Sequence, residues 1–235
     1  MFAASNTEGC NNYVPTEVDV KVQYDEVDYD YTTPMLKIRD LSEGGKGKDS
    51  LHSEAWPVGL STGEMYFRVN SDIMKMRAGY SQTTCGQIKS IQVEFGFKDN
   101  KIYVAKEFPK RSCPFKVVLA HEEKHKAVDR ALLEDHSEKI RIAMRDIAKK
   151  IGVVQSASAV VVEDQINSVL NQEVNKLMRG VEDDLKERQK EVDTKEEYQR
   201  VTDSCEGRTM EIVQQRLELL EESHPGITKV RQGSR

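Results

Sequence analysis

The chain has 235 residues, of which 35 are basic and 40 acidic, a net charge of −5, and a hydrophobic share of 37%. Its basic residues are interspersed with acids instead of forming a patch, so we expect no nucleic-acid partner. The sequence contains no run of about 18 apolar residues, so we expect no membrane-spanning helix. The apolar content is nevertheless sufficient for a folded core.

The first 112 residues are typical of β-structure. Four runs rich in Val, Ile, Tyr and Phe predict strands, at 17–31, 64–71, 88–97 and 101–108. Turn-forming clusters such as SEGGKGKDS and KDNK separate them. Apolar residues alternate in the last two runs, which predicts a hairpin whose turn is KDNK. We therefore expect a small, mostly antiparallel sheet.

After Pro114 the spacing of apolar residues changes to three or four, which predicts three long helices at roughly 115–151, 158–192 and 195–222. Gly152 separates the first two, and DTKEE is an N-cap signal for the third. The predicted fold is α+β, a small antiparallel sheet in residues 1–112 followed by long antiparallel helices in 113–235, together one continuous domain. Apolar stripes on these charged helices also allow a homodimer.

Four cysteines at wide spacing favour two disulfides in an oxidising compartment. Four buried thiols in a cytosolic protein would give the same count. The pairing we prefer joins Cys85 to Cys113 and Cys10 to Cys205, although spacing alone does not choose among the three pairings. The opening MFAASNTEGCNNY has no basic or apolar region of a signal peptide, so we expect that peptide to be absent from the sequence as given.

The most specific motif is His121-Glu122-x-x-His125, in the middle of the first predicted helix. Positions four apart share one helix face, so both imidazoles point with the apolar stripe and can meet one ion about 2.0–2.1 Å from each nitrogen. Glu122, about 100° round the helix, is placed to take a proton from a metal-activated water. This is the H-E-x-x-H pattern of zinc metallopeptidases, although its middle residues, Glu123 and Lys124, are unusually charged.

The third ligand is not apparent from the motif. If the first two helices turn near residue 154, the positions facing the histidines lie near 183–187. That stretch contains or adjoins Glu182, Asp183 and Asp184, and Asp129 is a rival on the motif helix. Each of these acids is also consistent with a solvated surface charge. The remaining histidines are expected at the surface: His52, His136 and His224.

Two further roles follow from chain order. In metallopeptidases of this kind an extended peptide lies along an edge strand beside the motif helix, and NKIYVAKEFP, the last predicted strand, is in the right place to supply it. A phenol would help to stabilise the oxyanion of the tetrahedral intermediate, and Tyr198 or Tyr103 could provide it. Most tyrosines of such a chain, however, pack in the sheet.

The segments SEAWPVG with Trp56, CGQIKSIQVEF, YVAKEFPKRSCPFKVVLAHEEKHKAVDR and DTKEEYQRVTDSC resemble a group of bacterial secreted or periplasmic proteins identified as zinc-dependent proteases. The resemblance covers roughly residues 56–205. It implies an extracytoplasmic location, Zn²⁺ as the metal and peptide-bond hydrolysis as the activity. That activity is itself inferred from the motif.

We therefore expect a periplasmic or secreted zinc metallopeptidase acting on a peptide or protein substrate. In this hypothesis His121 and His125 bind the metal and Glu122 is the catalytic general base. The alternative is a non-enzymatic module in which the helical hairpin binds another protein and the histidine pair is structural or vestigial.

Overall fold

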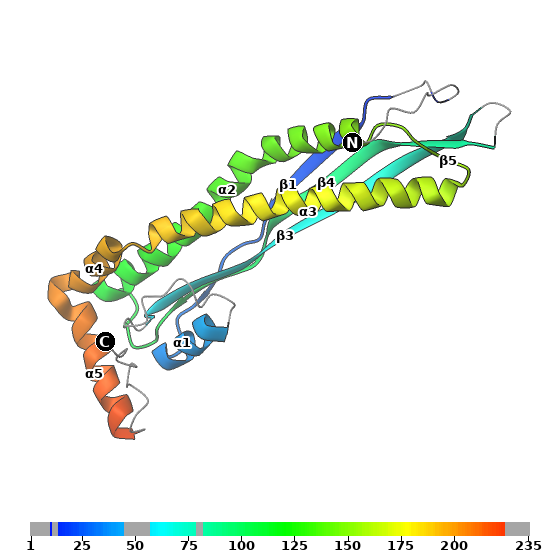
Figure 1. The fold of residues 1–235 in the computed structure, drawn as a ribbon. Helices are drawn as coiled ribbons and strands as arrows, with labels where there is room; N and C mark the ends of the chain where they lie inside the picture. Colours follow the sequence, from blue (N-terminus) through cyan, green and yellow to red (C-terminus); the bar gives the residue numbers. More distant parts are fainter. Residues whose placement is uncertain (1–9, 11–13, 45–56, 79–81, 224–235) are drawn as a thin grey trace, which may run out of the picture. The chain divides into compact units, whose positions relative to one another are not determined.

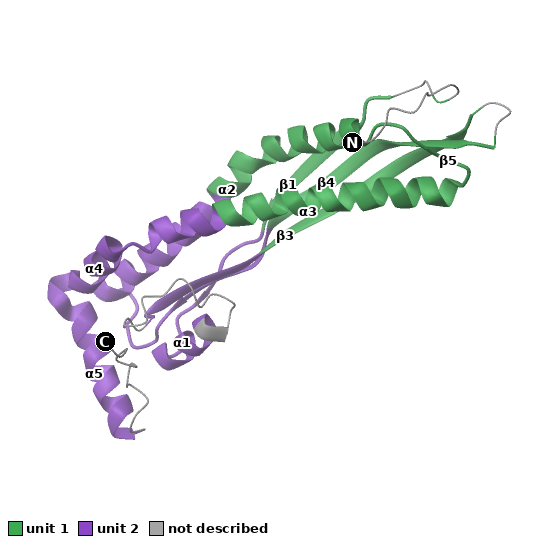
Figure 2. Cartoon of the chain, viewed as in Figure 1, with its two compact units in different colours: residues 1–24, 65–96, 131–184 green, residues 25–64, 97–130, 185–235 purple. Residues whose placement is uncertain are grey.

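A computed structural model describes residue 10 and residues 14–44, 57–78 and 82–223 of the chain. Trp56, His52 and His224 lie outside these ranges. The chain divides into two compact units, the first made of residues 1–24, 65–96 and 131–184 and the second of 25–64, 97–130 and 185–235 (Figure 2). Each unit therefore draws both on the β-rich first half of the chain and on its helical second half.

The strands differ from the prediction mainly in length (Figure 1). The first predicted run divides into β1 (Glu17–Tyr24) and β2 (Asp28–Asp30), and β3 (Gly59–Arg77) and β4 (Thr84–Val104) are 19 and 21 residues long. A short β5 (Val154–Ser156) follows between two helices. Because β4 is so long, it pairs with different strands along its length, and all four other strands pair with it.

The sheet is mixed, so the prediction of an antiparallel sheet was wrong in part. Strand β2 pairs with β4 in parallel, with Tyr29 opposite Ile102, whereas β5 pairs with β4 antiparallel, with Gln155 opposite Cys85. A parallel neighbour needs a connection that crosses back, and here α1 (Met35–Gly44) and β3 lie between the two strands in the chain. The α+β class itself is confirmed.

The predicted hairpin at KDNK is also wrong, because this segment lies inside β4. Asp99 has a φ of 53°, and the buried face changes there from odd to even positions, from Phe95 and Phe97 to Ile102 and Val104. One additional residue in a strand produces such a change of face, as in a β-bulge. The polar cluster therefore marks an irregularity within one strand and not a reversal of the chain.

Three of the helix ends have a local capping feature. Helix α2 (Cys113–Ile151) begins after Ser112, whose Oγ accepts the N–H of Phe115 at 3.3 Å, and it ends at Gly152, where φ is +62°. Helix α3 is Ala159–Val192. Helix α4 (Lys195–Asp203) is capped by Thr194, which accepts the N–H of Glu197 at 3.2 Å. This confirms the N-cap predicted from DTKEE.

The third predicted helix is two helices. After α4 the chain makes a short 3₁₀ turn, η1 (Cys205–Gly207), before α5 (Arg208–Ser223). Cys205, Glu206 and Gly207 have φ values of 61°, 59° and 80°, which no α-helix accommodates. The periodicity on either side hides this break, because Gly207 is its only strong sequence signal. No helix in the described part of the chain is long and apolar enough to cross a membrane.

The two disulfides join Cys10 to Cys85 and Cys113 to Cys205, with Cα separations of 5.9 and 5.8 Å. The presence of two disulfides agrees with the prediction, but the preferred pairing was wrong. Cys10 and Cys85 lie in unit 1 and Cys113 and Cys205 in unit 2, so each bridge joins two residues of the same unit.

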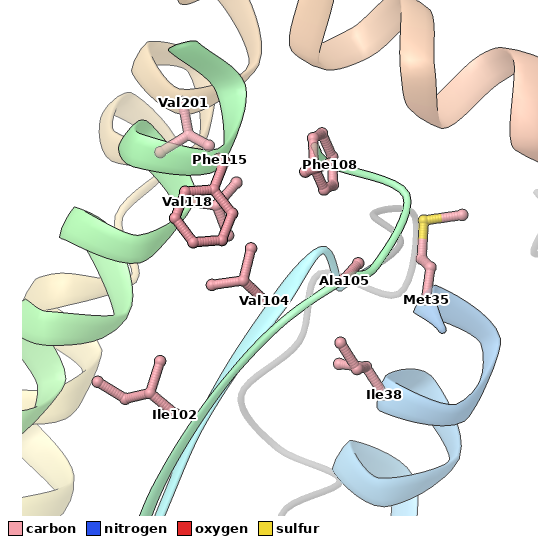
Figure 3. Close-up of a cluster of buried hydrophobic side chains, with 9 residues drawn as sticks. All are labelled: Met35, Ile38, Ile102, Val104, Ala105, Phe108, Phe115, Val118 and Val201. Carbon is pink, nitrogen blue, oxygen red and sulfur yellow. The ribbon is translucent and has the colours of Figure 1, made fainter. Parts of the chain in front are cut away.

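The core of unit 2 packs the end of β4 against α1, the start of α2 and α4 (Figure 3). Its buried members are Met35, Ile38, Ile102, Val104, Ala105, Phe108, Phe115, Val118 and Val201. In unit 1, α3 approaches β4 so closely that a Cβ on Gly86 would lie 2.3 Å from Val162 Cγ1. Unit 2 contains residues 113–130 of α2, which include the motif, and its core fixes the first two turns of this helix.

Candidate metal centre

The two motif histidines lie on the inner face of α2. His121 is 7% exposed and the side chain of His125 is 14% exposed, although both are polar. Their ring centroids are 5.1 Å apart and the ring planes are nearly perpendicular, at 87°. Val118 and Leu132, on the same stripe, are fully buried. The helical spacing therefore places both imidazoles inside the protein, as the sequence indicates.

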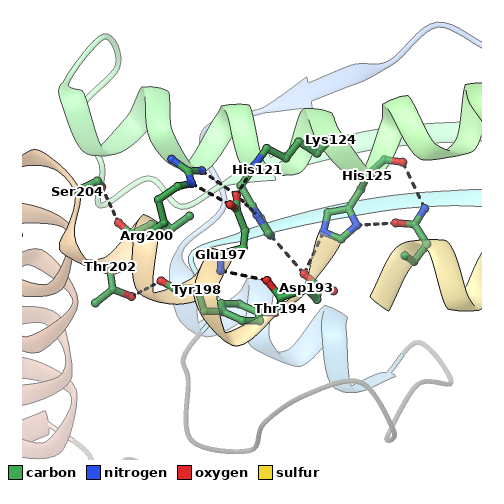
Figure 4. A network of polar contacts seen from close by, with 12 residues as sticks. His121, Lys124, His125, Asp193, Thr194, Glu197, Tyr198, Arg200, Thr202 and Ser204 are labelled. Carbon is green, nitrogen blue, oxygen red and sulfur yellow. Dashed lines mark hydrogen bonds and ion pairs between the residues drawn. The ribbon is translucent and has the colours of Figure 1, made fainter. Parts of the chain in front are cut away.

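Both Nε2 atoms point at one carboxylate oxygen, Oδ1 of Asp193, at 3.3 Å from His121 and 3.2 Å from His125 (Figure 4). Charged N–H···O hydrogen bonds are usually shorter, about 2.7–2.9 Å. Two ligands of one tetrahedral zinc, each about 2.0–2.1 Å from the ion, lie about 3.3–3.4 Å apart. These three residues form a group that could hold a metal ion.

Asp193 is not among the acids that the sequence suggested as third ligands. Asp184 is hydrogen-bonded to His136 at 2.7 Å, and Glu182 and Asp183 are exposed. The error lies in where the helical hairpin turns. Residues 153–158, which include β5, connect α2 to α3 in place of a tight turn. The midpoint between the paired residues His125 and Gln189 is therefore residue 157 and not 154.

The Nδ1 atoms of both rings have acceptors. His125 Nδ1 lies 2.6 Å from Gln189 Oε1, and His121 Nδ1 lies 3.2 Å from Glu197 Oε1. An Nδ1–H donated to an oxygen leaves the Nε2 lone pair free to bind a cation, which is the usual arrangement of metal-binding histidines. In the neutral rings both Nε2 lone pairs then face the Asp193 carboxylate, a geometry that favours a cation between them.

Glu197 also explains the charged middle of the motif. Its Oε1 accepts from Lys124 Nζ at 2.6 Å and from Arg200 Nη2 at 2.7 Å, in addition to His121. Arg200, followed by Lys124 and His121, keeps the pKa of Glu197 well below its usual range despite partial burial. Lys124 therefore holds the carboxylate that orients His121, whereas Glu123 is exposed.

Glu122 is buried, with 6% of its surface exposed, and faces the first residues of β3. A Cβ on Gly59 would lie 2.4 Å from Glu122 Oε1, so this position has room only for glycine. The Ser61 N–H donates to the carboxylate. Burial raises the pKa of Glu122 to about 7, against the opposing effect of the two histidines and this hydrogen bond.

Burial and the neighbouring charges shift the pKa values of the three candidate ligands in opposite directions. Burial alone would lower the pKa of His125, but Asp193 and Glu122 outweigh it and raise that pKa to about 8. The pKa of His121 is raised for the same reasons. Burial of Asp193 is outweighed by the two imidazoles, which hold its pKa well below its usual range. In the metal-free protein the imidazoles are thus stabilised as cations by Asp193.

Of the two tyrosines considered from the sequence, Tyr198 lies at the site. Its ring centroid is 6.0 Å from that of His121, and its hydroxyl is hydrogen-bonded to Asp193. Burial, and then Asp193, raises its pKa above the usual range. Tyr103 instead packs against the core of unit 2, with Lys101 Nζ 5.1 Å from its ring.

No family model, curated protein or solved structure matches the chain.

Proposed function

We propose that the protein is a zinc-dependent metallopeptidase. The observation that carries the proposal is that the Nε2 atoms of His121 and His125 converge on Asp193 Oδ1, at 3.3 and 3.2 Å. The buried Glu122 directly follows His121 in the sequence. Two imidazoles and one carboxylate are the ligand set of the His₂-carboxylate catalytic zinc sites, which keep a fourth position open. Borderline nitrogen ligands make Zn²⁺ a better candidate than Mg²⁺ or Ca²⁺.

In this proposal His121, His125 and Asp193 hold the ion, which, when bound, lowers the pKa of water and polarises a peptide carbonyl. Glu122 takes the proton of the attacking water and later gives it to the leaving amine. A raised pKa suits this exchange near neutral pH, because the group must both accept and release a proton. The Tyr198 hydroxyl orients Asp193, which supports a positioning role for this tyrosine in preference to the oxyanion role expected from the sequence.

The strand expected to bind substrate needs correction. Only residues 100–104 of NKIYVAKEFP belong to β4, which is paired with β2 at residues 101–103, and Val58 O accepts the N–H of Ala105 just after the strand. Within the described residues β3 pairs with β4 alone, and its start lies against Glu122. We propose that an extended peptide adds to the free edge of β3 near Gly59.

The two disulfides support an oxidising compartment, and we propose a secreted or periplasmic location on that basis. The resemblance of residues 56–205 to bacterial zinc-dependent proteases points the same way. It rests on the same motif as the metal site and is therefore no independent support for catalysis.

The proposal is tested by zinc content and peptide hydrolysis of the purified protein and of Glu122→Gln. We expect about one zinc per chain in both, and hydrolysis about 10²–10⁴-fold slower in the variant, the range that loss of general-base catalysis costs. Glu123→Gln, a change at the adjacent exposed glutamate, is the matched control and should be fully active. Absence of zinc would overturn the metal centre. Bound zinc with hydrolysis unchanged in Glu122→Gln would make the site structural, as in the alternative of a non-enzymatic binding module.

A further inference from the structure

A chain of buried polar side chains leads away from the Nδ1 side of His125. Beyond Gln189 it consists of Asp129, Lys126 and Asn100, which are 4%, 2% and 2% exposed. A buried lysine–aspartate pair is a poor source of stability, since replacing such a pair by apolar residues is often neutral or favourable. These residues therefore call for a role other than stabilising the fold.

Each hydrogen bond in this row of side chains has a fixed donor and a fixed acceptor. The backbone carbonyl of Asp25 can only accept, and it takes the N–H of Asn100 Nδ2 at 2.9 Å. Asn100 therefore presents Oδ1 to Lys126 Nζ, at 3.1 Å. Lys126 can only donate, and its second partner is Asp129 Oδ2, at 3.0 Å. The Asn100 amide therefore has a single orientation, whereas Lys126 acts only as a donor and Asp129 only as an acceptor.

Asp129 then fixes the amide of Gln189. Its Oδ1 accepts from Gln189 Nε2 at 2.8 Å, and the backbone carbonyl of His125 accepts from the same nitrogen at 3.3 Å. With its NH₂ engaged by two acceptors, the amide must turn Oε1 toward His125 Nδ1, 2.6 Å away. The neutral ring therefore carries its proton on Nδ1 and directs the lone pair of Nε2 at Asp193.

We propose that Asn100, Lys126, Asp129 and Gln189 are positioning residues that select the tautomer of His125 with Nε2 free, and thereby set the affinity of the centre for a divalent cation. This inference rests on the proposed metal site. It assigns to a buried lysine one residue beyond the motif a role that the H-E-x-x-H pattern does not contain.

The neighbouring strand β3 leaves room for this row of polar side chains. A Cβ on Gly63 would lie 2.6 Å from Asn100 Oδ1 and 2.8 Å from Lys126 Nζ, so a larger residue there would displace both groups. Glycine at this point of β3 leaves space for the lysine–asparagine contact.

The first test replaces Asp129 by Asn, which can offer its NH₂ to Gln189 and so allow the glutamine amide to turn over. We measure Zn²⁺ affinity by competition with a chromophoric chelator, and the His125 tautomer by long-range ¹H–¹⁵N correlation. Loss of such an outer partner usually costs about 10–100-fold in metal affinity, and we expect Asp129→Asn to fall in this range with a mixed tautomer. Asp146→Asn, at an exposed aspartate on the same helix, is the control and should bind zinc normally.

The second test exchanges the two groups in the double variant Asp129→Asn/Gln189→Glu. Here a carboxylate at 189 accepts from His125 and from the new amide at 129, whose oxygen accepts from Lys126, so an acceptor again faces His125 Nδ1 and the net charge is restored. We expect zinc affinity several-fold tighter than in Asp129→Asn. A role in packing alone predicts the opposite, that a second buried change weakens binding further.

The outcomes separate this inference from the proposed function. If the unmodified protein binds no zinc, the metal centre itself is wrong. If it binds zinc and Asp129→Asn binds equally tightly, or if the double variant is weaker than the single, the positioning role is overturned and the metal centre stands. Should Asp129→Asn fail to fold, Gln189→Leu at the half-buried end of α3 gives the same test, with the same 10–100-fold loss expected.

Discussion

Asp193 and Asp184 each contact histidine, but their surroundings give them different chemistry. Asp184 meets the single imidazole of His136 at 2.7 Å, the length of an ordinary charged hydrogen bond. Asp193 meets two imidazoles at 3.2 and 3.3 Å and is held by the Tyr198 hydroxyl. At the scale of single residues, the second arrangement is the one that fits an ion.

Replacing each aspartate by alanine tests this difference. Asp193→Ala should weaken Zn²⁺ binding by more than about 100-fold, because losing an outer partner of a ligand already costs 10–100-fold. Asp184→Ala should leave zinc affinity unchanged. Isothermal titration calorimetry of both variants measures this directly, and equal affinities would show that Asp193 is no ligand.

Gly59 is the second position where one residue decides the site. A methyl group there would lie 2.4 Å from Glu122 Oε1 and 2.8 Å from Val118 Cγ1, so the glutamate must move. We expect Gly59→Ala to keep about one zinc per chain but to hydrolyse peptides about 10²-fold more slowly, the cost of misplacing a catalytic group by about 1 Å. Zinc content and turnover, measured on the same sample, check the two expectations. Full activity would mean that Glu122 tolerates the shift or is not the base.

At the level of secondary-structure elements, Gly180 and Gly152 differ in their surroundings and in their backbone conformation. Gly180 lies within α3, and a Cβ added there would meet no atom within 4 Å. Gly152 ends α2 with a φ of +62°, a conformation that L-residues adopt only with strain. The same substitution should therefore have opposite effects at the two positions.

We expect Gly180→Ala to stabilise the protein by about 0.5–1 kcal/mol, because alanine is the better helix former. Gly152→Ala should destabilise it by about 1 kcal/mol. Urea denaturation followed by circular dichroism gives both values. A destabilised Gly180→Ala would indicate that this stretch of α3 faces a neighbour.

At the scale of the whole molecule, each disulfide belongs to one compact unit. Cys113–Cys205 ties the start of α2 to the turn after α4 in the unit that carries the candidate metal centre. Cys10–Cys85 joins two residues of the other unit. The two bridges span 92 and 75 residues, so their entropic contributions should be nearly equal.

Replacing each cysteine pair by serine should therefore lower stability by a similar amount, about 2–5 kcal/mol. Zinc affinity should fall only when Cys113 and Cys205 are replaced, because α4 carries Glu197 and follows Asp193. Denaturation curves and zinc titrations of both double variants provide the comparison. A loss of zinc affinity on removing Cys10–Cys85 would contradict this assignment.

Features that depend on local chemistry could be predicted from the amino-acid sequence. Helical spacing placed His121 and His125 together on the inner face of α2, and Thr194 and Gly152 marked helix ends, because periodicity and capping act over a few residues. The α+β class followed from the change of period near Pro114. The presence of two disulfides followed from the cysteine count.

Features that depend on contacts between distant segments emerge only in the folded protein. The predicted hairpin became one strand because a single left-handed residue, Asp99, does not reverse the chain. The third ligand candidate is Asp193 and not Asp184, since the connection through β5 moves the midpoint of the turn between α2 and α3 from residue 154 to residue 157. The cysteine pairing and the lysine–aspartate chain behind His125 likewise depend on which elements pack together. Neither spacing nor composition encodes that packing.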